Sequence, residues 1–133
     1  IEKELAEAGL ADRAVHLGEV DDMAALLAGA RAVAFPVDDL YGKVDVPMVL
    51  LEAAALGIPV VAASGGPLEG LLGASLVPPR EPEALAAALA PLLDDEQARR
   101  EAGARLESVY YARFSPAVVA AAYDALYAEL CAK

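Results

Sequence analysis

The chain has 133 residues, of which 58% are hydrophobic and 5% are aromatic, and its 21 acidic and 10 basic side chains give a formal net charge of −11. This length and apolar content suit one packed domain over residues 1–133 and argue against a disordered chain. The acidic balance argues against nucleic acid and anionic membranes as partners, because both are recognised by a basic face.

Apolar runs that alternate with helical patterns run through the first part of the chain. They predict helices over 3–9, 22–30 and 47–56 and buried strands over 14–20, 31–37, 58–64 and 74–79. We expect Asp21 to cap the second helix, Pro47 to stand in the first turn of the third helix, and Gly57 to close it.

Three further helices are predicted over 82–93, 94–114 and 115–133. Asp94 and Gln97 have the spacing of a capping box, and Ser115 is the expected cap of the last helix. The aromatic residues of the last two helices have helical spacing, so we expect them to pack helix against helix. These residues are Tyr110, Tyr111, Phe114, Tyr123 and Tyr127. Buried strands alternating with helices predict an α/β fold with a parallel sheet covered on both faces.

Several features bear on the location of the protein and on the start of the chain. Cys131 is the single cysteine and cannot form an internal disulfide, and with one histidine it makes no metal site, so we expect a cytoplasmic protein. The first residues lack the pattern of a signal peptide, and no uninterrupted apolar run reaches the roughly 18 residues of a membrane span. Because Ile1 is not an initiator methionine, we expect the chain to be truncated at its N-terminus.

The carboxyl ends of the strands are the expected place for a ligand in a parallel sheet. The segments that follow the predicted strands are 18–22, 36–47, 64–70 and 78–81. The loop 36–47 is the longest and most polar, and it leads into a helix whose first N–H groups, at Met48 and Val49, suit a phosphate. Gly65 and Gly66 either let the backbone approach a ligand closely or form a plain flexible turn.

Glu52 is the one charged residue between Val46 and Ala63. A buried, unpaired carboxylate is costly, so Glu52 either serves a ligand or lies on an exposed stripe of its helix.

Five segments in order resemble the C-terminal half of retaining glycosyltransferases of group 1, which have the GT-B fold and include glycogen and sucrose synthases. They are "LADRAVHLGEV", "LLAGARAVAFPV", "VPMVLLEAAALGIPVVAASGGPLEG", "LVPPREPEALAAALAPLLDD" and "ARFSPAVVAAAYDALYAEL". The resemblance implies a Rossmann-like domain that binds a nucleotide-diphosphate sugar and faces an acceptor domain of the same protein across a cleft. It also implies that no metal or other cofactor is needed.

The resemblance assigns roles to individual residues. Glu52 matches the second glutamate of the paired-glutamate motif of the family and would accept hydrogen bonds from the donor ribose. The first glutamate is replaced by Val44, and the neighbouring Asp45 substitutes for it if the motif is shifted by one residue. The full set of expected substrate-binding residues is Gly18 and Val20 of the base-side loop, Lys43, Asp45, Met48, Val49, Glu52, Ser64, Gly65 and Gly66. No catalytic nucleophile is identifiable.

The implied function is transfer of a sugar from a nucleotide-diphosphate sugar to an unknown acceptor by a hexosyltransferase-type enzyme, with this chain inactive alone. One alternative is a degenerate transferase domain kept for binding, because Val44 replaces a motif glutamate. A second alternative is a receiver-like signalling domain with a phosphoacceptor pocket. Its acidic pairs would be Asp21–Asp22 and Asp38–Asp39 near Ser64, but Arg80 stands where a receiver has a lysine.

Overall fold

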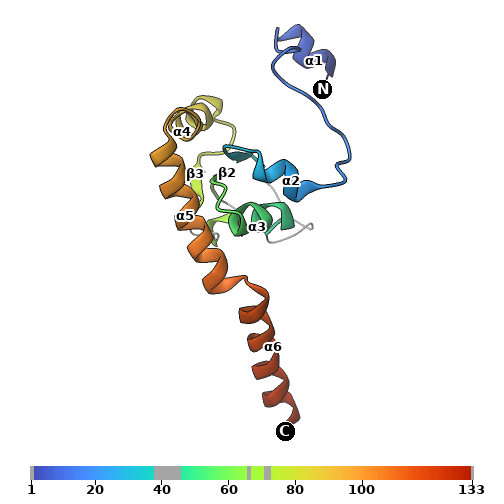
Figure 1. Cartoon of the computed structure of the whole chain (residues 1–133), viewed down its shortest axis with the longest axis vertical. Coiled ribbons are helices and arrows are strands. Elements are labelled where there is room, and N and C mark those ends of the chain that lie inside the picture. The colour runs from blue at the N-terminus through green and yellow to red at the C-terminus, as the bar shows by residue number, and fades with distance from the viewer. Residues whose placement is uncertain (1, 38–45, 66, 71–72, 133) are drawn as a thin grey trace.

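The computed structural model describes residues 2–37, 46–65, 67–70 and 73–132, so Lys43, Asp45 and Gly66 lie outside the described part. A small parallel sheet flanked by helices forms the body of the molecule (Figure 1). The elements in chain order are α1 (Glu2–Glu7), α2 (Met23–Ala28), β1 (Val33–Phe35), α3 (Met48–Ala55), β2 (Val60–Ala63), the 3₁₀ turn η1 (Pro67–Gly70), β3 (Ser75–Val77), α4 (Pro82–Asp94), α5 (Glu96–Arg113) and α6 (Pro116–Cys131).

The three strands are parallel and lie in the order β1–β2–β3. Val33 of β1 pairs with Val60, and Ala62 of β2 pairs with Leu76 of β3. All four residues of the central strand β2 are buried. The predicted parallel sheet is therefore confirmed, with strands inside the ranges 31–37, 58–64 and 74–79.

The predicted strand over 14–20 is wrong. In the described part of the chain this segment has no strand, and Val15 and Leu17 are 82% and 55% exposed. Its apolar residues fit a buried strand, but a strand also needs a hydrogen-bonded neighbour, and no strand of the sheet pairs with this segment.

Helices cover both faces of the sheet, as the sequence predicts. On one face, Leu50 and Ala53 of α3 form a core cluster with Val60 and Leu106. On the other face, Val61 and Val77 pack with Leu92 of α4 and Ala102 of α5. Neighbouring residues of β2 thus point to opposite clusters, as the alternation of side chains along a strand requires.

The helix caps differ by one residue from the sequence prediction in two places. The carboxylate of Asp22, and not of Asp21, accepts the N–H of Ala25 at the start of α2. At the start of α5 the cap is Asp95 and not Asp94, and it accepts from Gln97 and Ala98. In both places the acidic residue adjacent to the helix is the one that reaches its first free N–H groups.

Three other helix ends follow the prediction in position. Pro47 precedes α3 as its N-cap, and Gly57, with φ +65°, follows its last turn. Ser115 is the N-cap of α6, but its hydroxyl donates to the carbonyl of Tyr111 instead of capping the helix.

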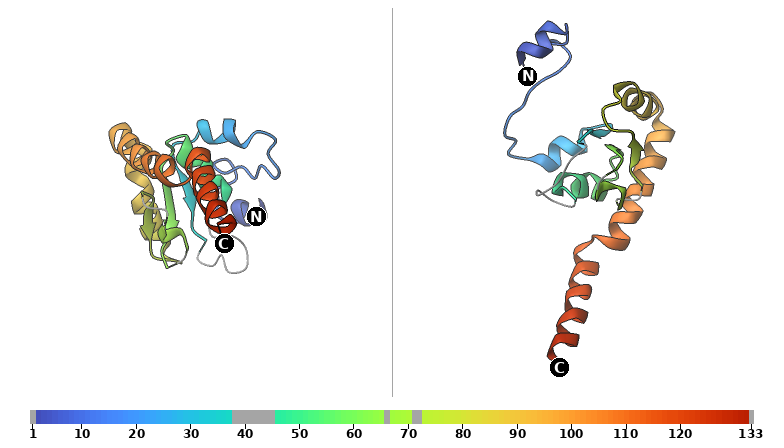
Figure 2. Two further views of the ribbon diagram at one scale, coloured as in Figure 1. Left: turned by 90° about the horizontal axis from the view of Figure 1, so that it is seen from below. Right: turned by 180° about the vertical axis from the view of Figure 1, so that it is seen from behind.

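The two ends of the described chain project from the body (Figure 2). Helix α6 has no buried residue, and Tyr123 and Tyr127 contact each other on its exposed surface. Tyr110 and Phe114 of the preceding segment pack against the core, as predicted. The prediction that Tyr111, Tyr123 and Tyr127 pack between helices is wrong, since α6 points away from the body and Tyr111 is exposed. Among the described residues, no helix is both long enough and apolar enough for a membrane span.

Candidate functional site

The carboxyl ends of the three strands lie at one edge of the sheet, because the strands are parallel. Pro36 follows β1, Ser64 follows β2 and Pro78 follows β3. Helix α3 begins on the chain that leaves this edge after β1, and it returns the chain to β2. The edge therefore combines strand ends with a helix N-terminus, which is the usual setting of a ligand site in such a sheet.

Helix α3 presents Glu52 to solvent. Glu52 and Met48 are both exposed, and their spacing of four residues puts them on the same face of the helix. The opposite face, with Leu50, Ala53 and Ala54, is fully buried. The interpretation of Glu52 as part of an exposed helical stripe is therefore correct, and its carboxylate is accessible to a ligand.

The first turn of α3 has backbone donors that the helix itself does not use. The N–H of Leu50 donates to the carbonyl of Pro47 at 3.0 Å. The N–H groups of Met48 and Val49 precede it and have no acceptor within the helix. The side chain of Val49 packs against the core, so its backbone N–H is the polar group that this residue could offer to a ligand.

The turn after β2 is held at both ends. The N–H of Ser64 donates to the carbonyl of Val77 at 2.8 Å, and Leu68 is buried in the core. Between them, Gly65 has φ +88° and donates its N–H to Oε1 of Glu69 at 2.7 Å. The Gly65 amide is thus occupied by a carboxylate of its own turn. Glu69 is absent from the predicted site, and the signal that could have found it is a carboxylate four residues after a glycine.

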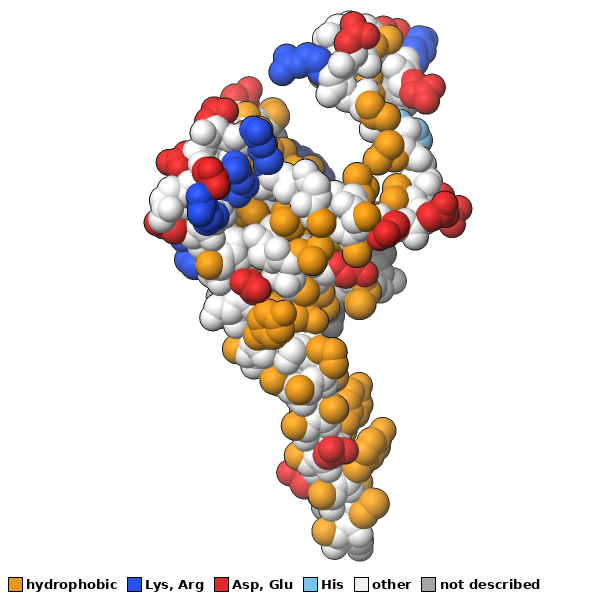
Figure 3. Space-filling view, viewed as in Figure 1, with side chains coloured by type: hydrophobic (Ala, Val, Ile, Leu, Met, Phe, Trp, Pro, Cys, Tyr) orange, Lys and Arg blue, Asp and Glu red, His pale blue; other side chains and the backbone are white. Residues whose placement is uncertain are grey.

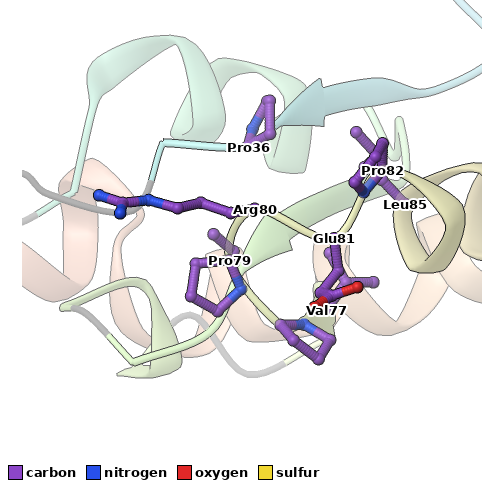
Figure 4. Close-up of a pocket in the computed structure, with 9 residues that line it drawn as sticks. Pro36, Val77, Pro79, Arg80, Glu81, Pro82 and Leu85 are labelled. Carbon is purple, nitrogen blue, oxygen red and sulfur yellow. The ribbon is translucent and has the colours of Figure 1, made fainter.

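A pocket of about 460 Å³ opens at the same edge of the sheet (Figure 4). It is lined by Pro36, Ala63, Val77, Pro78, Pro79, Arg80, Glu81, Pro82 and Leu85. These residues follow or end all three strands and include the first turn of α4. Among the described residues, the pocket takes Pro36 from the predicted segment 36–47 and four residues from 78–81, but none from 64–70. Arg80 has φ +63°, a left-handed conformation that residues with a side chain rarely adopt.

Other predicted site residues lie elsewhere. Gly18 and Val20 belong to the segment that forms no strand, and Gly18 is exposed with open space where a side chain would stand. Neither lines the pocket at the sheet edge. Asp22 caps α2, which gives a structural role to one member of the Asp21–Asp22 pair of the receiver-like alternative. The other pair, Asp38–Asp39, lies outside the described residues.

Basic side chains gather over α4 and α5 in Figure 3, within a surface that is acidic overall. Two of the arginines of this region serve the fold. Arg31 donates to the carbonyl of Leu93 at 3.0 Å, and Arg99 donates to the carbonyl of Leu92 at 3.1 Å. Both bonds satisfy carbonyls in the last turn of α4, as cations at a helix C-terminus do.

Residues 1–95 match the model of a protein family described as "Glycosyl transferases group 1". The chain belongs to this family. The glycosyltransferase family that the sequence resembles is therefore confirmed.

Solved structures share the fold of the chain. Sucrose-phosphate synthase from Thermosynechococcus elongatus is 29% identical with a TM-score of 0.84, and the match covers 98% of this chain and 33% of that protein. HepE from Anabaena, solved in complex with UDP-glucose, is 26% identical with a TM-score of 0.74, over 90% of this chain and 32% of that protein. The chain thus spans about a third of each of these structures and has the Rossmann-like architecture of a GT-B domain.

A curated relative is an exopolysaccharide phosphotransferase from Streptomyces coelicolor. It is 34% identical over 130 residues, which cover 94% of this chain and 13% of the relative. The chain therefore corresponds to about an eighth of that protein.

Proposed function

We propose that the chain is the donor-binding domain of a glycosyltransferase that moves a sugar from a nucleotide-diphosphate sugar to an acceptor. The observation that carries this proposal is the exposed Glu52, one turn into a helix that starts at the carboxyl edge of the sheet, in a chain of the group 1 family. A related protein, HepE, has been solved with UDP-glucose.

Glu52 would bind the ribose of the donor. The two oxygens of a carboxylate can accept hydrogen bonds from two neighbouring hydroxyls, and a charged acceptor strengthens such bonds. Met48 starts the helix, about 6 Å along its axis from Glu52. A ribose at Glu52 would therefore leave the diphosphate near the N–H groups of Met48 and Val49.

The diphosphate is the leaving group of the reaction. Negative charge develops on it as the bond to the sugar breaks, and aligned N–H groups and basic side chains stabilise that charge. We propose that the first turn of α3 and Lys43 supply this stabilisation, and that Asp45 handles the donor sugar. Donor binding would then need no divalent metal.

The acceptor would be bound by another part of the protein. Since the chain spans about a third of the solved relatives, we propose that an acceptor domain of the same protein completes the cleft and that this chain alone transfers no sugar. A cytoplasmic location remains part of this proposal.

A second candidate function is binding without transfer. Val44 occupies the position of the first motif glutamate, and this substitution favours a domain that holds the donor but has lost its chemistry. Both candidates predict donor binding at Glu52. They differ in whether the full-length gene product has turnover.

The test is the affinity of UDP, GDP and ADP, measured by titration calorimetry on this chain and on the full-length gene product. The variant is Glu52→Ala, and the matched control is Glu129→Ala, which removes an exposed glutamate from α6. We expect one nucleotide to bind and Glu52→Ala to weaken it at least tenfold, which is about 1.4 kcal/mol. The control variant and added EDTA should leave the affinity unchanged.

Two outcomes would contradict the proposal: no binding of any of the three nucleotides, or binding that does not depend on Glu52. Nucleotide binding by the full-length protein without sugar transfer would favour the binding-only function. Sugar transfer by this chain alone would overturn the need for a second domain.

A further inference from the structure

The pocket at the carboxyl edge of the sheet has an unusual lining for a sugar. Seven of the nine lining residues that the structure describes are apolar, and four of these are prolines. A sugar presents many hydroxyl groups, and a site that holds one must offer hydrogen-bond partners to them or leave them unsatisfied. The pocket therefore suits an apolar chain or ring better than a bare sugar.

The charged residues of the pocket, Arg80 and Glu81, are neighbours in the loop before α4. Figure 4 shows their side chains leaving the backbone in different directions, with Arg80 extending past Pro36. The guanidinium group is a planar donor that matches the oxygens of a phosphate or carboxylate. The pocket thus combines an apolar lining with a guanidinium group at one side.

The backbone of Arg80 supports a role for its side chain. Its φ of +63° lies in the left-handed region, where a glycine has no steric cost and a residue with a Cβ does. Strained residues of this kind cluster at ligand sites, where the position of the side chain matters more than local stability. A glycine would suit the turn better, so the arginine stands here against its own backbone preference.

We propose that this pocket binds a ligand that carries an apolar chain or ring beside a phosphate or carboxylate, with Arg80 holding the anionic group. The binding of this ligand at the sheet edge does not rest on the proposed function.

The probe is n-octyl phosphate below its micellar concentration, titrated into the protein. Inorganic phosphate tests the anionic group alone, and octyl glucoside tests the chain with an uncharged head. The variant is Arg80→Gly, which removes the guanidinium and relieves the left-handed backbone, so it is expected to fold. Arg100→Ala, on the exposed face of α5, is the matched control.

We expect octyl phosphate to bind at least tenfold more tightly than inorganic phosphate or octyl glucoside. Arg80→Gly should weaken octyl phosphate at least tenfold while the protein becomes no less stable to urea, and Arg100→Ala should change neither property. A merely structural arginine would give the opposite result, with stability altered and affinity intact. Equal affinities of the Arg80→Gly variant and the parent protein, or no binding of octyl phosphate at millimolar concentration, would overturn the proposal.

Two further measurements are made. One distinguishes a lipid headgroup from a soluble anion as the ligand, and the other distinguishes failure of this proposal from failure of the proposed donor site. Vesicles containing phosphatidic acid that bind in an Arg80-dependent way would identify a lipid headgroup, and octyl phosphate binding without vesicle binding would identify a soluble anion. Glu52→Ala should leave octyl phosphate binding unchanged. Loss of nucleotide binding with octyl phosphate binding intact would therefore overturn the donor site alone.

Discussion

Gly103 of α5 has no side chain because the backbone of Gly57 occupies the space where one would stand. A Cβ built on Gly103 would lie 1.9 Å from the carbonyl oxygen of Gly57. The end of α3 and the middle of α5 therefore touch backbone to backbone. This contact fixes the helix that carries Glu52.

We predict that Gly103→Ala lowers the free energy of unfolding by about 1–3 kcal/mol, because the added methyl group must push α3 and α5 apart. Urea denaturation followed by circular dichroism measures the effect. Gly29→Ala is the control, since its added Cβ would lie 3.6 Å from the carbonyl oxygen of Leu26, which is an ordinary van der Waals distance. Equal stabilities of the two variants would show that α3 and α5 are less closely packed than the structure has them.

Single residues of the candidate site differ in how far the sequence predicts them. The exposure of Glu52 follows from helical spacing, because Leu50, Ala53 and Ala54 define the opposite, buried face. The left-handed backbone of Arg80 does not follow from any spacing rule, and the spacing of Gly65 and Glu69 permits their hydrogen bond without predicting it. They depend on how a turn is placed between two strands, which local sequence does not determine.

At the scale of elements, α4 and α5 share a junction of two aspartates. Asp94 is the last residue of α4, and Asp95 stands between the helices with an extended backbone. Its carboxylate accepts from Gln97 at 2.8 Å and from Ala98 at 3.1 Å. The capping-box spacing of Asp94 and Gln97 predicts Asp94 as the cap. This is wrong because Asp94 is the last residue of the preceding helix.

We expect Asp95→Ala to cost about 1 kcal/mol of stability, the usual loss for a helix N-cap. Asp94→Ala should have an effect within about 0.5 kcal/mol, because Asp94 is exposed and an acidic residue at a helix C-terminus gains nothing from the helix dipole. Thermal and urea unfolding of the two variants measure the difference. A larger loss of stability for Asp94→Ala than for Asp95→Ala would show that Asp94, which the sequence pattern favours, is the N-cap of α5.

The strands show where pattern reading succeeds and where it does not. The run 58–63 is continuously apolar and contains the buried central strand β2. The run 14–20 is less apolar, because it contains His16, Gly18 and Glu19, and it has no paired neighbour in the described sheet. A short apolar run indicates that a segment can be buried, but whether it pairs as a strand depends on the neighbouring strands of the sheet.

At the scale of the whole molecule, many apolar side chains lie on the surface and not in the core. Val118, Val119, Tyr123, Leu126, Tyr127 and Leu130 of α6 are between 38% and 59% exposed. Figure 3 shows hydrophobic side chains along this projecting helix. The composition correctly indicates a packed domain, but it cannot show that one apolar helix lies outside it.

We predict that a chain ending at Ser115 keeps the stability of the body. Helix α6 contributes no buried residue, so its removal should change the free energy of unfolding by no more than about 0.5 kcal/mol, as for other surface changes. A chain ending at Asp95 is the control, because it also loses Ala102 and Leu106 from the two core clusters and should not fold. Urea denaturation of the three chains decides the matter. A loss above about 1.5 kcal/mol on removing α6 alone would mean that its apolar face folds back onto the body in solution, where it would bury the surface that the structure leaves exposed.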